Sequence, residues 1–492
     1  MWGKDSSAQL LLTAETLKEF QEAIPIHKLS IIFSEAIRIT RSLGFSYLWL
    51  DSLCIIQGSA SDWTNEANMM SAVYNNAICT IAFLFPPNIG FCRARDDPRA
   101  STPCIVRGIL GQSDFIYVTP SNSTESWHPR NNWPLSSRAW VLQEHLLSPR
   151  TILYGHRTIM WECGEIIHYE LDFTRTNRLS AGALKPGIHM SRYNLNQTSD
   201  SLSVDARPKS GMEKHETFSD WARLIREYRR RDLSYSSDRI IAMVGIARAF
   251  HSEHGFTYLA GMWKEQLPSS LLWYIRILPS RNMAELFLTR EPRSESVPTW
   301  SWFASPIYKH CELIVSNHNT FDDFRESYFV AEFLYFKWSK ELDNDASPTA
   351  YYNFEGLQIT LKLATHVTTI LLKEPYGEDD TPSLSCDSLE EDLASCLGFD
   401  RTLLAASYDC DDLETLFQPP AEVRIALIAE DVDLTYCRHH LQGLALAPGV
   451  ESGTWRRIGY WKAWVDLGDD TWEKESIFLR LEGVKIESLT LV

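Results

Sequence analysis

The chain has 492 residues, of which 44% are hydrophobic and 12% aromatic, and its formal net charge is -17. This length favours two or three domains, and the apolar share supplies enough core material to exclude wholesale disorder. The acidity is local, because residues 374–414 hold thirteen Asp/Glu and a single Arg, a balance of -12. We interpret this stretch as an acidic insertion. The overall charge therefore constrains partners only weakly, and no basic stripe predicts nucleic-acid binding.

Two further absences in the sequence narrow the function classes. The first twelve residues lack a charged region followed by an apolar one, and no run approaches about 18 apolar residues, so we expect a cytoplasmic protein without a membrane span. Ten cysteines show no repeated CxxC spacing, which predicts neither a metal site nor a disulfide framework. The phosphate-loop, dinucleotide-binding, zinc-protease and serine-hydrolase motifs are also missing, which excludes the commonest enzyme classes.

The first 165 residues alternate helical and strand-like patterns. The spacing predicts a helix over 33–43 ended by Gly44, a strand over 47–50 closed by Asp51, a helix over 62–75 and a strand over 77–85. This alternation implies that the helices are crossover connections between parallel strands. It therefore predicts an α/β domain over residues 1–165, built on a parallel sheet flanked by helices.

The rest of the chain divides by pattern into further regions. A compact helix over 137–147, with Ser136 or Ser137 as its N-cap, leads into strands over 150–154 and 158–163. The remaining predicted regions are a polar linker or surface excursion over 166–215, a helical region over 216–310 and a β-rich region over 311–492 that contains the acidic insertion.

Glu144 is the most informative candidate for chemistry. It shares an otherwise apolar helix face with Trp140 and Leu147, at spacings i+4 and i+7 from the tryptophan. A carboxylate there is either a partly buried group paired with a nearby cation such as Arg150, or a site carboxylate beside an aromatic wall. The pattern alone leaves both interpretations open.

Asp51 is the second candidate. It follows the predicted strand over 47–50, at the edge where parallel sheets place ligand-contacting groups, and Ser52 and Cys54 come directly after it. It is equally well interpreted as an N-cap or turn residue. Cys54 with His145 as its base would form a nucleophilic pair, but the apolar run around Cys54 favours a buried, inert thiol.

Several blocks resemble, in order and spacing, those of the fungal heterokaryon-incompatibility (HET) domain. They are YLWLDSLCIIQ (47–57), DWTNEANMMSAVYNNAICTIAF (62–83), PLSSRAWVLQEHLLSPRTILYG (134–155) and MWEC (160–163). YSSDRIIAMVGIARAF (235–250), YLAGMWKEQLPSSLLW (258–273) and VPTWSWFASP (297–306) resemble the region that often follows this domain. The resemblance implies fungal non-self recognition and a cell-death effector, acting with itself or with a HET-type protein partner.

The HET domain has been likened to the TIR fold, whose NAD-cleaving members carry a W-C-x-x-E block with a catalytic glutamate. Trp140 and Glu144 keep that spacing, with Val141 in place of the cysteine. The resemblance thus implies Glu144 as a catalytic carboxylate and NAD as a substrate rather than a bound cofactor. Trp140, Asp51, Ser52, Trp2 and Arg138 are the implied substrate-binding residues.

Two alternatives to an enzyme stay open. Family members usually begin with a strand that ends in a S-x-x-W-G-like block, and this chain begins at Met1-Trp2-Gly3, at the end of that block. We therefore expect the first strand to be missing, which would expose apolar surface and unpaired backbone groups. The protein is then an active effector, a non-catalytic signalling or self-association module, or an inactive truncated family member.

Overall fold

The computed structural model describes the chain in segments. These are residues 10–84, 104–107, 115–118, 134–155, 159–164, 166–170, 172–178, 211–235, 238–277, 297–305, 311–315, 325–329, 331–338, 359–372, 402–408, 421–433, 438–466 and 484–492. They divide into two compact units. Unit 1 holds the described residues of 1–206 and 231–249, and unit 2 holds those of 207–230 and 250–492. Residues 1–9, which include Trp2, lie outside the described residues, so the expectation that the first strand is missing is not tested.

Two helices of unit 1, α2 and α4, begin at serine residues that cap them. In α2 (Ile31–Ser42) the Ser30 hydroxyl accepts the Phe33 N–H at 3.3 Å, and Gly44 follows with φ +80°. In α4 (Ala60–Asn76) the Ser59 hydroxyl accepts from the Asp62 N–H. Both predicted helices are confirmed. The others are α1 (Leu17–Glu22), the 3-10 turn η2 (Ile26–Lys28), α3 (Asp51–Cys54), the 3-10 turn η4 (Pro134–Ser137), α6 (Ala139–Leu147) and the start of α8 (Asp238–His254).

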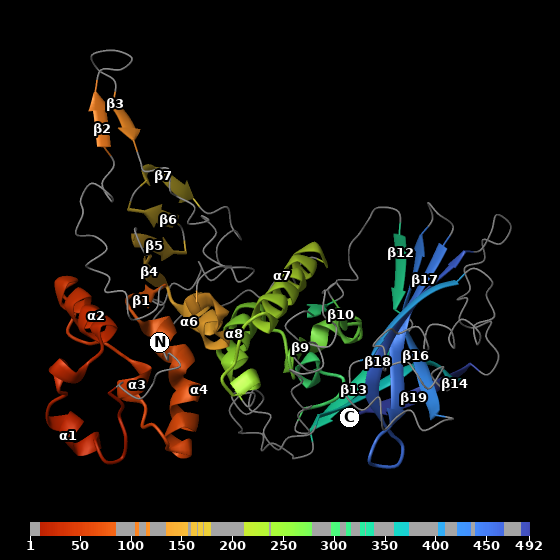
Figure 1. Ribbon diagram of the computed structural model, residues 1–492. Coiled ribbons are helices and arrows are strands. Elements are labelled where there is room, and N and C mark those ends of the chain that lie inside the picture. Colours follow the sequence, from red (N-terminus) through yellow and green to blue (C-terminus); the bar gives the residue numbers. More distant parts are fainter. Residues whose placement is uncertain are drawn as a thin grey trace, which may run out of the picture. The chain divides into compact units, whose positions relative to one another are not determined.

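The sheet of unit 1 is mixed. Its strand order is β1-β4-β5-β6-β7, and these strands follow one another in that order in Figure 1. β1 pairs with β4 in parallel, and every later pair is antiparallel, so the expected parallel sheet is confirmed for one pair only. The strands are β1 (Thr80–Phe83), β4 (Arg150–Tyr154), β5 (Ile159–Cys163), β6 (Ile166–Tyr169) and β7 (Asp172–Arg178), with a separate hairpin of β2 (Cys104–Arg107) and β3 (Phe115–Val118).

The predicted strand over 47–50 is wrong. The chain there has no regular secondary structure, and Asp51 opens α3 instead of closing a strand. A strand needs a neighbour that takes up its backbone N–H and C=O groups. Among the described residues β1 pairs with β4 alone, and 45–51 lies across a cavity from β1. The segment 47–50 is apolar, as a buried strand would be, but no described strand pairs with it.

Helix α6 also starts differently from the prediction. Its N-cap is Arg138, which makes no side-chain cap, rather than Ser136 or Ser137. The Ala139 N–H donates instead to the Asp232 carbonyl at 2.9 Å, in a short parallel bridge between 138 and 232. A backbone carbonyl from a distant segment therefore takes the place of the serine hydroxyl at this helix end.

Unit 2 combines helices with a β-rich region, as expected. Its strand order is β12-β16-β17-β18-β19-β14-β13, with β15 beside β18, and a β14–β16 pairing closes five of these strands into a ring (Figure 1). The strands are β12 (Arg325–Phe329), β13 (Glu332–Trp338), β14 (Ile359–Leu372), β15 (Thr402–Tyr408), β16 (Ala421–Asp433), β17 (Arg438–Pro448), β18 (Thr454–Asp466) and β19 (Lys485–Leu491). β15 lies within the acidic insertion.

The helical part of unit 2 is shorter than predicted. It consists of α7 (Gly211–Arg229), the end of α8 and the 3-10 turns η6 (Lys264–Gln266), η7 (Ser269–Leu271) and η8 (Trp302–Ala304). The apolar run over 267–275 forms η7 and part of a strand rather than a helix. The accompanying strands are β8 (Tyr258–Leu259), β9 (Met262–Trp263), β10 (Tyr274–Ile277) and β11 (Cys311–Ile314). Within the predicted linker the structure also places β6, β7 and the start of α7.

Tryptophans build the core of unit 2. Trp221, Trp263 and Trp302 are fully buried, and the indoles of Trp221 and Trp302 both donate to the Gly261 carbonyl, at 3.0 and 2.9 Å. Gly261 lies in the two-residue turn between β8 and β9, where both Ala260 and Gly261 have positive φ. This turn suits a tight hairpin and presents one carbonyl to two indoles.

Candidate functional site

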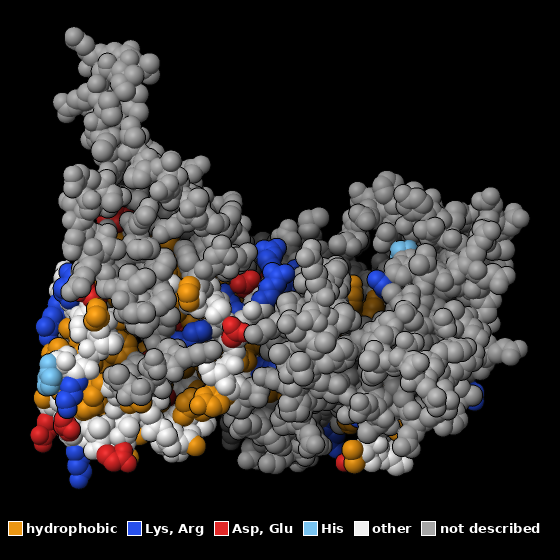
Figure 2. All heavy atoms as spheres, viewed as in Figure 1, with side chains coloured by type: hydrophobic (Ala, Val, Ile, Leu, Met, Phe, Trp, Pro, Cys, Tyr) orange, Lys and Arg blue, Asp and Glu red, His pale blue; other side chains and the backbone are white. Residues whose placement is uncertain are grey.

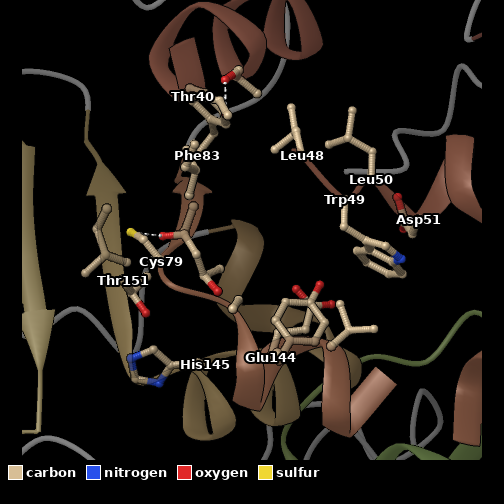
Figure 3. Close-up of a pocket in the computed structure, with 18 of the residues that line it drawn as sticks. Thr40, Leu48, Trp49, Leu50, Asp51, Cys79, Phe83, Glu144, His145 and Thr151 are labelled. Atoms are coloured by element: carbon tan, nitrogen blue, oxygen red, sulfur yellow. Dashed lines mark hydrogen bonds between the residues drawn. The ribbon is translucent and has the colours of Figure 1, made fainter. Parts of the chain in front are cut away.

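A cavity of about 540 Å³ lies in unit 1, and Figure 3 looks into it. Its walls are α2, the segment 45–51, the end of α4, β1 and α6. Leu43, Phe45 and Tyr47 line it and are themselves exposed, Tyr47 to 93%, so they form the rim of its opening. The size falls within the usual range for small-molecule sites.

Helix α6 carries Glu144 into this cavity. The residues around it on the helix, Val141, Leu142, Leu146 and Leu147, are buried apolar side chains that hold α6 against the rest of the unit. Glu144 itself is half-buried, and Figure 3 shows its carboxylate directed into the open space below the segment that carries Leu48 and Leu50. A carboxylate among buried apolar side chains of α6 thus faces a cavity.

The surroundings of Glu144 favour its neutral form. Burial raises the pKa of the Glu144 carboxyl, and the negative charge of Asp51 raises it further. The Arg138 guanidinium and a hydrogen bond from the Tyr74 hydroxyl act in the opposite direction on this pKa. Burial, together with Glu144, also raises the pKa of Tyr74 well above its usual value, so Tyr74 stays a donor. Such perturbation is typical of functional sites.

The alternative pairing of Glu144 with Arg150 is not formed. Arg150 is exposed and donates to the Ile78 carbonyl at 3.4 Å. The cations that line the cavity are Arg138, which is half-buried, and Arg231, which is buried and donates to the Arg138 carbonyl at 3.4 Å. The cavity therefore contains both carboxylates and guanidinium groups.

Asp51 is the first residue of α3, whose N-cap is Leu50, so the N-cap interpretation is wrong and the site role stays a prediction. Its Oδ1 accepts the Ser52 N–H at 2.8 Å, so it stabilises the short helix α3, and it also lines the cavity within electrostatic reach of Glu144. Ser52 is buried and is not among the cavity-lining residues. Its role in binding substrate stays a prediction.

The aromatic wall of the cavity is Trp49 and Tyr74, whose rings meet edge to face at 5.8 Å. Trp140, the tryptophan singled out from the sequence, is not among the lining residues. Its indole donates to Asp238 Oδ2 at 3.0 Å and packs edge to face on Trp63 at 6.4 Å. The sequence offered one signal for Trp49, its place two residues before Asp51, and none for Tyr74.

A second polar group lies at the other end of the cavity. The register pairs Thr80 of β1 with Thr151 of β4, and Thr151 with Glu162 of β5, so these three side chains share one face of the sheet. His145 of α6 reaches this row, with its Nε2 2.8 Å from Glu162 Oε2. Thr151, Glu162 and His145 all line the cavity.

The cysteine hypothesis finds no support in the geometry. Cys54 is exposed and is not among the cavity-lining residues, whereas His145 is bonded to Glu162. Cys79 does line the cavity, but burial raises the pKa of its thiol and so disfavours a thiolate. A Cys54–His145 pair is therefore not assembled.

In the part of the chain that the structure describes, no cluster of three or more His, Cys, Asp or Glu side chains is arranged to bind a metal ion. No helix in the same residues is long and apolar enough to cross a membrane.

The comparisons with known proteins agree with the resemblance seen in the blocks. Residues 1–144 match the family model described as heterokaryon incompatibility protein (HET). Neither a curated protein nor a solved structure matches the chain, so the likeness to the TIR fold stays a prediction. The match ends at Glu144, and it includes α6 up to the residue that faces the cavity. Over residues 1–144, this chain therefore carries a domain of the heterokaryon-incompatibility family.

Proposed function

We propose that this protein is a cytoplasmic effector of fungal non-self recognition that causes cell death by hydrolysing NAD in the cavity of unit 1. The observation that carries the proposal is the Glu144 carboxylate, which faces a cavity with an aromatic wall and nearby guanidinium groups. Membership of the HET family supports the biological role, and the Trp140/Glu144 spacing supports the chemistry.

The reaction needs few groups from the protein. The bond between ribose C1′ and the pyridinium nitrogen breaks, and its electron pair goes to the ring, which leaves as neutral nicotinamide. Positive charge develops on the ribose, and water then bonds to C1′ and releases a proton. A Glu144 carboxylate beside the ribose would stabilise that charge, an electrostatic effect worth most where water is excluded.

Other residues of the cavity suit the remainder of NAD. The indole of Trp49 and the ring of Tyr74 offer faces for a planar base. Arg138 and Arg231 line the cavity and would bind the pyrophosphate, with Arg138 also lowering the pKa of Glu144 and so favouring its ionised form. The Tyr74 hydroxyl would hold the carboxylate in position.

The decisive experiment compares NAD loss with purified wild type and Glu144→Gln, under conditions that promote oligomers. We expect the variant to lose at least about 100-fold in turnover, because an isosteric amide removes the charge that stabilises the ribose cation. Glu22→Gln, on the exposed surface of α1, is the matched control and should keep full activity. Equal turnover in both variants, or none in wild type, would refute the proposal.

A second function is favoured by the apolar rim of the cavity. Leu43, Phe45 and Tyr47 are exposed there, and Figure 2 shows hydrophobic side chains on the surface of the N-terminal part among polar ones. This surface would suit self-association or a HET-type protein partner, without catalysis. Cell killing by two variants distinguishes the two functions. If Glu144→Ala still kills cells while Tyr47→Asp does not, the interaction explains the activity.

A further inference from the structure

The polar row at the far end of the cavity is only partly satisfied by the protein. The Thr80 hydroxyl lies 2.6 Å from the Ser148 hydroxyl, and His145 is bonded to Glu162. The Thr151 hydroxyl, between them in the register, is buried, with only 2% of the residue exposed, and makes no hydrogen bond. A buried hydroxyl without a partner is destabilising, so it calls for a ligand or another explanation.

The geometry provides such an explanation, because Thr151 lines the cavity. In Figure 3 the Thr151 oxygen and the His145 ring lie on the same side of the open space, with Glu144 on the other. His145 Nε2 faces the Glu162 carboxylate, which can only accept, so Nε2 carries the hydrogen of that bond. In the neutral ring His145 Nδ1 is then an acceptor, while the Thr151 hydroxyl is free to donate.

A donor and an acceptor on the same side of the cavity match a primary carboxamide, whose C=O accepts and whose NH₂ donates. A carboxylate fits poorly, because it offers no hydrogen to Nδ1 and brings a negative charge next to Glu162, only 2% of whose side chain is exposed. We propose that Thr151 and His145 form a subsite that binds the carboxamide of the nicotinamide ring, with the ribose then directed toward Glu144. This inference rests on the proposed function and names the part of the substrate that the far end of the cavity recognises.

The test measures binding, not turnover. Nicotinamide and nicotinate, which differ only in carboxamide against carboxylate, are titrated against the full chain by ligand-observed NMR. We expect nicotinamide to bind about 10-fold or more tightly than nicotinate, because only the carboxamide offers a hydrogen to His145 Nδ1. Thr151→Val should weaken nicotinamide binding by about 10-fold, the usual effect of losing one buried hydrogen bond. The valine should fold normally, since it replaces an unpartnered hydroxyl by an apolar group of the same shape.

Two further variants control for structural effects. Thr80→Val makes the same change one strand away, but removes a hydroxyl already bonded to Ser148, so it should lower stability while leaving nicotinamide binding unchanged. Thr151→Ser keeps the hydroxyl and should keep nicotinamide binding. The inference is overturned if wild type does not distinguish the two probes, if it binds neither, or if Thr151→Val behaves as wild type.

The outcomes also separate this inference from the proposed function. Glu144→Gln should abolish NAD cleavage and still prefer nicotinamide. A wild type that cleaves NAD without preferring nicotinamide would overturn the subsite alone. A wild type that binds nicotinamide through Thr151 but leaves NAD intact would overturn the proposed reaction and keep the subsite.

Discussion

The two units bury charged groups in opposite ways. In unit 2, Arg457 is fully buried, donates to the carbonyls of Leu271 and Trp273, and stacks over the Trp273 ring at 3.6 Å from its centroid. In unit 1, Glu144 faces a cavity, and burial raises the pKa of its carboxyl. The fold gives Arg457 hydrogen-bond partners, whereas the surroundings of Glu144 disfavour its charged form.

This difference separates a structural charge from a functional one. A buried cation with donors matched to backbone carbonyls stabilises one arrangement of the chain, and it has no capacity left for a ligand. A carboxylate beside open space, with an unpartnered threonine hydroxyl in the same cavity, keeps hydrogen-bonding capacity that the protein does not use. In unit 1 this capacity lies at a cavity, where a ligand can use it.

The largest predicted loss of stability follows from removing the buried charge of Arg457 in unit 2. Arg457→Met leaves the Leu271 and Trp273 carbonyls without their donors in a closed core, and we expect a loss of about 3–5 kcal/mol in the free energy of unfolding. Denaturant unfolding followed by tryptophan fluorescence measures it. Arg457→Lys keeps the charge but lacks the guanidinium that donates to both carbonyls. Its free energy of unfolding should lie between those of wild type and Arg457→Met. A loss below about 1 kcal/mol would contradict the structural role of Arg457.

A smaller loss is expected at the turn that organises the tryptophans. A Cβ on Gly261 would meet the Trp302 Nε1 at 2.5 Å, and the backbone there has φ +93°, so Gly261→Ala should cost about 2–3 kcal/mol. Gly453→Ala is the matched control in the same unit, because its φ is +81° and no atom lies within 4 Å. It should cost only about 1 kcal/mol. Equal melting temperatures for the two variants would show that the clash is absorbed.

The smallest predicted effect is a gain in the free energy of unfolding, and it depends on pH. Because the folded-state pKa of Glu144 is raised above 4.5, the folded protein holds this proton more tightly than the unfolded chain does, and stability falls as pH rises through that window. Glu144→Gln lacks this term. Its free energy of unfolding should match that of wild type below pH 4.5 and exceed it at neutral pH. Urea unfolding from pH 4 to 8 measures the difference, and parallel curves would contradict it.

Local patterns predicted many elements correctly but not their pairing. The helices α2 and α4 and the strand β4 follow from periodicity and caps, because those signals act within a few residues. The strand over 47–50 failed for the opposite reason: its apolar run is local, whereas its hydrogen-bonding partner would have to come from elsewhere in the chain. The N-cap of α6 failed in the same way, since Asp232 supplies it from a distant segment.

Sequence blocks and periodicities were sufficient to recognise the family of residues 1–144, the β-rich nature of the C-terminal region and Glu144 as a candidate, because these signals lie along the chain. Which side chains meet depends on packing and strand register. Trp140 and Trp49 look alike as aromatic neighbours of a carboxylate, yet packing places Trp49 at the cavity and bonds Trp140 to Asp238. The row of Thr80, Thr151 and Glu162 exists only through strand register, which joins residues about 70 positions apart.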